Sequence, residues 1–169
     1  MAIARQSQEL EASPDKSIGN LVSDALWFAL HSLLAVFLLA AVWGIITLAH
    51  PDPDSATPKV FATALAFLVP LVAGFLIART QRNREHAQVA RHVWIAGLLL
   101  FAAICVWVLD LPTGPGLCET CGPAEKLWRT FFDINHGSGL MGGDGLLVGA
   151  WVPLSMIGYA AGAALGLKV

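Results

Sequence analysis

Two cysteines separated by two residues are the first feature of this sequence that suggests chemistry. Cys118 and Cys121 enclose a glutamate and a threonine. Such a pair can act as a redox dithiol, form a small disulfide or supply half of a metal site. A metal ion would need two further ligands, and only Asp133, His136 and Asp144 stand nearby in the chain. We expect a structural disulfide and no metal site, with redox exchange as the open alternative.

Histidines are the second feature with chemical potential, because two of them at similar membrane depth can ligate a haem b. His31 lies about six residues inside the first long apolar run, and His92 opens the third. An ionisable side chain within a membrane span indicates function by default. We expect His31 to make a polar contact between helices and no cofactor to be bound. Haem ligation by His31 and His92 is kept as an alternative.

A glycine-rich stretch at 133–145 brings Asp133, His136 and Asp144 together in sequence, where they could face a polar ligand. The stretch does not match a phosphate-binding loop, which needs a Gly-Lys-Ser/Thr run after a strand. We expect a re-entrant or interfacial loop, with Asp144 capping the helix that follows.

The amino-acid composition indicates which kind of secondary structure holds these residues. The chain has 169 residues, of which 56% are hydrophobic and 13% charged, and its mean hydropathy is +0.67. A soluble domain would have about a quarter of its residues charged, and the net charge of -2 leaves no basic surface for nucleic acid. Four apolar runs, each about long enough to cross a bilayer, predict an all-α integral membrane protein with a four-helix bundle. They are 25–49, 60–78, 93–109 and 146–167.

The basic residues predict how the chain is threaded. Seven Lys or Arg residues fall on the side that holds both termini and the link between the second and third helices, against three on the other side. The positive-inside rule then places both termini in the cytoplasm. We expect a multi-pass protein of the bacterial inner membrane. It would have a mobile polar tail at 1–22, a membrane domain at 23–169 and a long outer loop at 110–145. Within this loop, the segment around Trp128 and Arg129 suggests a short amphipathic helix at the headgroups.

Glycine spacing gives the clearest packing signal. Gly158, Gly162 and Gly166 are four residues apart, so they share one face of the fourth helix. Such a glycine zipper lets another helix approach closely. The partner can be another helix of this bundle, another protein or a second copy.

Two resemblances bear on function. Four helices with an external Cys118/Cys121 pair resemble, in outline, the bacterial disulfide-bond oxidases and the vitamin K epoxide reductase family. That resemblance implies a thiol–disulfide oxidoreductase that works with quinone. Those families relay electrons through a second cysteine pair, whereas here the only other cysteine is Cys105, inside the third helix. The Asp-Pro-rich first outer loop is similar to that of the four-helix membrane anchors of DNA translocases.

The sequence favours a non-catalytic subunit or accessory protein of a membrane complex. We expect it to contact the lipid bilayer and to dock on other membrane subunits, or on itself, through the fourth helix and the outer loop. No acidic or basic residue lies within the four runs, which argues against an ion-coupled transporter. The oxidoreductase, the haem-bearing anchor and the translocase-like anchor remain as alternatives.

Overall fold

Helices make up nearly all of the described structure. The computed structural model describes residues 14–50, 55–81, 84–113, 120–134 and 148–168, and these ranges contain no strand. In chain order the helices are α2 (Pro14–Ala49), α3 (Ala56–Thr80), α4 (Arg84–Ala90), α5 (Trp94–Asp110), α6 (Pro123–Phe131) and α7 (Trp151–Lys168). The all-helical prediction is therefore confirmed for the described residues.

Three stretches of helix are long and apolar enough to cross a membrane: Gly19–Ala49, Ala56–Thr80 and Glu85–Asp110. A membrane-spanning helical protein follows from their length and composition. The predicted fourth crossing corresponds to α7, which has 18 residues and is not among these three. The count of four crossings and the orientation of the termini remain predictions.

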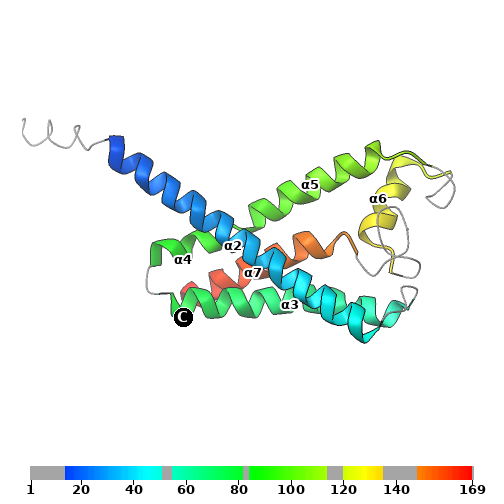
Figure 1. The fold of residues 1–169 in the computed structure, drawn as a ribbon, viewed down its shortest axis with the longest axis horizontal. Helices are drawn as coiled ribbons and strands as arrows, with labels where there is room; N and C mark the ends of the chain where they lie inside the picture. Colours follow the sequence, from blue (N-terminus) through cyan, green and yellow to red (C-terminus); the bar gives the residue numbers. More distant parts are fainter. Residues whose placement is uncertain (1–13, 51–54, 82–83, 114–119, 135–147, 169) are drawn as a thin grey trace, which may run out of the picture.

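The first helix begins well before its apolar run. α2 starts at Pro14, inside the segment expected to be a polar tail, and continues to Ala49. Proline fits the first turn of a helix, because its missing N–H would have no partner there anyway. Its 36 residues give a length of about 54 Å at 1.5 Å per residue. Figure 1 shows that the N-terminal end of α2 reaches beyond α3, α4 and α7.

α3 and α7 form the closest pair of helices. They run parallel, because Gly158, Gly162 and Gly166 of α7 meet Phe67, Leu71 and Phe75 of α3 in the same order. Both helices advance by four residues between contacts, so one face of each follows the other. Pro70 lies buried inside α3. α7 begins at Trp151, five residues later than predicted, so Pro153 falls in its first turn.

The third apolar run is preceded by an extra short helix. α4 is joined to α5 by a turn at Arg91, His92 and Val93. Figure 1 shows α5 leaving the region of α7 and rising away from it, with α6 near its far end. We call the end of the molecule with α4 and the C-terminus the α4 end, and the opposite end the α6 end.

α6 is the short amphipathic helix predicted around Trp128. Gly122 precedes it and Pro123 occupies its first position, as is common at helix starts. Its Lys126 Nζ donates a 2.6 Å hydrogen bond to the carbonyl oxygen of Leu111, just beyond α5. The ring of Phe131 lies 4.7 Å from that of Phe101 in α5. These contacts attach α6 to the far end of α5.

Candidate functional site: a buried histidine–tyrosine pair

His31 and Tyr159 form a polar contact inside the bundle. Nδ1 of His31 in α2 lies 2.6 Å from the hydroxyl oxygen of Tyr159 in α7. His31 is 2% exposed and Tyr159 is fully buried. Polar groups in an apolar interior need hydrogen-bond partners, since water cannot supply them there. The pair therefore joins two helices whose residues are 128 positions apart in sequence.

The other ring nitrogen of His31 has no hydrogen-bond partner. Nε2 is buried and unpaired, and so is the hydroxyl of the neighbouring Ser32. A neutral imidazole carries one donor and one acceptor nitrogen. Either tautomer thus leaves Nε2 with one unmet hydrogen-bonding requirement. A buried nitrogen of this kind is a candidate to bind a ligand or to take part in proton transfer.

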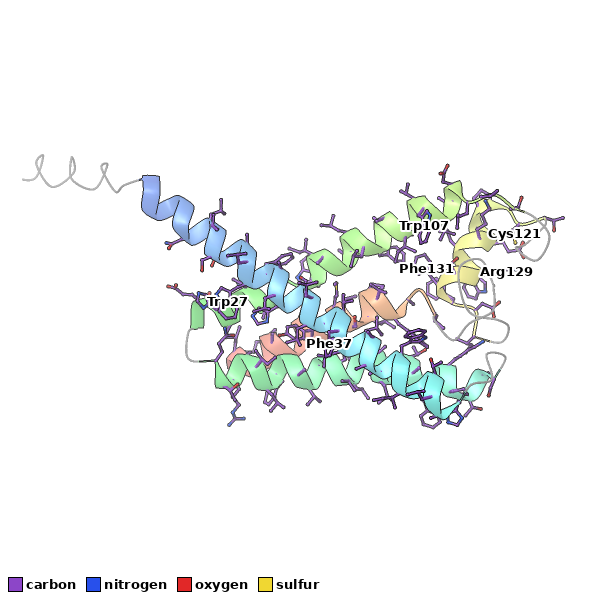
Figure 2. All side chains as sticks on the ribbon, viewed as in Figure 1. Trp27, Phe37, Trp107, Cys121, Arg129 and Phe131 are labelled. Carbon is purple, nitrogen blue, oxygen red and sulfur yellow. The ribbon has the colours of Figure 1, made fainter. Side chains whose placement is uncertain are left out.

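Aromatic rings connect this pair to the α4 end. The ring of Trp27 lies 5.8 Å from that of His31 and is stacked at 4.5 Å on the ring of His86 in α4. Figure 2 shows Trp27 beside α4. One cluster therefore contains two rings from α2, Trp27 and His31, with His86 from α4 and Tyr159 from α7.

A polar cavity of about 520 Å³ adjoins the cluster at His86. α2 contributes Asn20, Ser23 and Asp24 to its lining, and the α4 region contributes Glu85, His86, Gln88, Val89 and His92. His86, whose ring stacks on Trp27, is therefore also a lining residue of this cavity.

His31 and His92, the pair of the haem alternative, differ in burial, and their joint ligation of a haem stays a prediction. His92 is exposed in the turn after α4, where its Nε2 accepts a 3.4 Å hydrogen bond from Nε of Arg91. The histidine beside His31 is His86, which shares Trp27 with it. Sequence reasoning passed over His86 because it stands outside every apolar run.

The cysteines lie in a different part of the molecule. Cys121 stands just before α6 and is disulfide-bonded, whereas Cys105 in α5 is a free thiol. Cys118 lies outside the described residues, so its pairing with Cys121 stays a prediction. Figure 2 shows Cys121 at the α6 end and Trp27 at the α4 end. The histidine cluster and the cysteine segment are therefore two separate regions.

Of the three polar candidates of the long loop, only Asp133 is described. It follows α6, is partly exposed and takes part in an interaction. His136 and Asp144 lie outside the described residues, so the three-residue site and the helix cap stay predictions. Within the described ranges, no three His, Cys, Asp or Glu side chains are placed to hold a metal ion.

The glycines of α7 face α3 rather than an open surface. A methyl group at Gly158 or Gly162 would overlap the carbonyl oxygen of Phe67 or Leu71, respectively. The close approach also involves a glycine of α3, because a methyl group at Gly74 would overlap the carbonyl oxygen of Tyr159 in α7. Because α3 occupies this face, another protein cannot dock on it while the pair is intact.

Lys59 and Tyr159 are two residues that sequence reasoning misplaced or passed over. Lys59 was assigned to the first outer loop, but it lies in the first turn of α3 and is fully buried. Tyr159 is the only tyrosine of the chain, and a lone phenol within an apolar helix is a signal that could have pointed to it as a partner for His31.

Comparisons with known proteins add no family to this geometry. No protein-family model matches the chain, and no similarity was found to a curated protein or a solved structure. Its function must be inferred from its own residues.

Proposed function

We propose that this chain is a non-catalytic accessory subunit of a membrane complex, and that it docks on another protein through the N-terminal part of α2. The observation that carries the proposal is the length of α2. Its 36 residues extend about 54 Å, whereas the hydrocarbon core is about 30 Å thick. Even a tilted α2 extends out of that core at one end.

The N-terminal part of α2 has apolar side chains that no other helix in the described ranges covers. Leu21, Val22 and Leu26 are exposed by 70%, 53% and 66%, and they stand at the start of the stretch Gly19–Ala49 that is apolar enough to cross a membrane. On the other side of the same turns, Asn20, Ser23 and Asp24 face the polar cavity. A helix that extends beyond its bundle with one apolar side is typical of a segment that binds a groove on a partner.

The docking element differs from the one favoured by sequence alone. The fourth helix was expected to contribute its glycine face, but that face packs on α3. We therefore assign docking to α2. The outer loop at 110–145 stays the second docking element of the proposal, and its described part exposes Trp128 and Phe132 by 62% and 55%.

The test is the size of the complex that contains this chain after gentle detergent extraction from its own membranes. We expect wild type to migrate as a complex with a different protein, and Leu21→Glu/Leu26→Glu to migrate as the free chain. Leu48→Glu is the matched control, because Leu48 is 88% exposed at the opposite end of α2. A monomeric wild type, or a complex made only of this chain, would overturn the proposal.

We further propose the bacterial inner membrane as the location, with both termini in the cytoplasm. This part rests on the distribution of basic residues, including Arg79, Arg84 and Arg91 near the α4 end. Reporter fusions after Arg84 should report inside and those after Cys121 outside. The opposite pattern would reverse the orientation and place the cysteine segment on the reducing side.

The oxidoreductase is the second candidate, and the disulfide-bonded state of Cys121 is the observation that favours it. The structure also gives the reason to rank it lower: Cys105, the third cysteine, is a free thiol within α5. Added quinone should leave the thiol state of Cys118 and Cys121 unchanged if the disulfide is structural. Quinone-dependent reoxidation after reduction would favour the enzyme.

A further inference from the structure

An opening between α5 and α7 is the feature that the proposed function does not use. α5 meets α7 closely at Gly97, where an added methyl group would lie 3.0 Å from Cβ of Met156. Apart from Gly97, Val108 is the only fully buried residue of α5. Beyond Gly97 the two helices diverge, and α6 lies across the gap at the α6 end (Figure 1).

The space between these helices is a groove of about 410 Å³. Leu98 and Phe101 of α5, Phe131 of α6, and Leu154 and Ile157 of α7 are among its lining side chains. This volume is within the range of pockets that bind small ligands. The groove is therefore large enough to hold several methylene groups of a chain-like ligand.

The described side chains that line the groove offer no free hydrogen-bonding group to an occupant. Thr63 is the only polar side chain among its described lining residues. Its hydroxyl donates to the carbonyl oxygen of Lys59 at 2.7 Å and accepts from Nε1 of Trp151 at 2.8 Å. With this hydroxyl already paired, water in the groove would lack the two to four partners that it needs. The apolar lining therefore favours a hydrocarbon over water as the occupant of the groove.

We propose that an acyl chain of a membrane phospholipid occupies this groove, with its headgroup beside α6. The groove is continuous with the lipid-facing surface, because Leu98 and Ile157 belong to its lining and are 48% and 40% exposed. An unfilled gap would cost the lining its van der Waals contacts, and the surrounding hydrocarbon is the nearest material that restores them.

The amphipathic character of α6 sets the position of the headgroup. Its apolar side reaches the groove through Phe131, which is 1% exposed, while Arg129 and Glu125 form an exposed ion pair. Lys126 is engaged with the carbonyl oxygen of Leu111. Since these cations already have partners, binding depends on the acyl chain more than on the charge of the headgroup.

The test counts phospholipid molecules that stay on the purified chain, by native mass spectrometry after exchange into detergent. We expect wild type to retain one phospholipid and Ile157→Trp to retain it about tenfold less, the effect of excluding about two methylene groups. Leu165→Trp is the matched control, because Leu165 is on the same helix, 50% exposed and outside the groove. It should retain the lipid as wild type does.

A second pair of variants keeps the test valid if Ile157→Trp does not fold. Ala150→Phe adds a ring to the lining of the groove, whereas Ala103→Phe adds the same ring on a surface of α5 outside it. The proposal is overturned if wild type retains no lipid, or if the groove variants retain as much as their controls. Retention of an isoprenoid in place of a phospholipid, or occupation by a second copy of the chain, would also overturn it.

Discussion

α7 makes two interfaces that differ in how closely the main chains approach each other. Against α3, Gly158, Gly162 and Gly166 of α7 together with Gly74 of α3 let the two backbones approach closely. Against α5, one glycine at position 97 gives a single close contact, and the helices diverge beyond it. In lipid, helices gain little from hydrophobicity alone, so close packing decides which pairs associate. The number of small residues at each interface thus separates a tight pair from an open one.

The largest expected effect is at Gly162, and it tests the tight interface. Gly162→Leu should destabilise the chain by about 3 kcal/mol or more, because the side chain would displace the backbone of α3 at Leu71. Even Gly162→Ala should be destabilising, since its methyl group already overlaps the Leu71 carbonyl oxygen. Thermal unfolding in one detergent provides the measurement.

Gly44 supplies the control for this substitution. An added methyl group at Gly44 of α2 meets no neighbouring atom within 4 Å. Gly44→Ala should leave stability unchanged or raise it by up to about 1 kcal/mol through helix propensity. Equal losses for Gly162→Ala and Gly44→Ala would show that the close approach of α3 and α7 contributes nothing to stability.

The His31–Tyr159 contact extends the comparison to the interface of α7 with α2. Tyr159→Phe should cost about 0.6 kcal/mol and at most about 1.7 kcal/mol, the average and the maximum found in double-mutant cycles of hydrogen bonds between membrane helices. The double variant His31→Leu/Tyr159→Phe should recover much of this loss, because no buried polar atom of the pair is then unpaired. Unfolding of the four proteins of this double-mutant cycle measures the coupling. A coupling of zero would mean that the His31–Tyr159 contact does not stabilise the packing of α7 on α2.

Gly97 tests the open interface directly. Gly97→Leu should cost about 1 kcal/mol, less than Gly162→Leu, since α5 can shift toward the groove and Met156 can adjust its side chain. The two variants should be unfolded side by side in the same detergent. A loss at Gly97 that equals the loss at Gly162 would mean that α5 is held as rigidly as α3.

The smallest expected effect is on α6. Arg129→Ala removes an exposed ion pair of 2.8 Å with Glu125, one helical turn away. Such pairs contribute about 0.3–0.5 kcal/mol, so the unfolding temperature should change little. A large loss would indicate that α6 holds α5 in place through Arg129 and not through Lys126 and Phe131.

Local features of the fold were predictable because they depend on neighbours in sequence. α6 could be placed from the spacing of its aromatic and basic residues, and Pro123 supplies its start. The limits of α2 were less accessible, since residues 14–24 are too polar to register as an apolar run although they continue the helix. α4 was missed for the same reason, because its seven residues form a helix although they are not an apolar run.

The candidate site was predictable only in part. The position of His31 within an apolar run was enough to predict a polar contact between helices. Its neighbours Tyr159 and His86 could not be named from the sequence, because they lie far away along the chain. Hydropathy records that a residue lies in an apolar run, without indicating which neighbour it faces.

The sequence by itself determined that this chain is helical and apolar enough to span a membrane, and that α7 carries one face of small residues. Those properties follow from composition and from the helical repeat, which are local. Only the tertiary structure decided that this face packs on α3, that His31 meets Tyr159 and that α5 leaves a groove beside α7. Lipid and neighbouring helices are equally apolar, so hydrophobicity cannot distinguish between them, and shape complementarity between distant segments must make the choice.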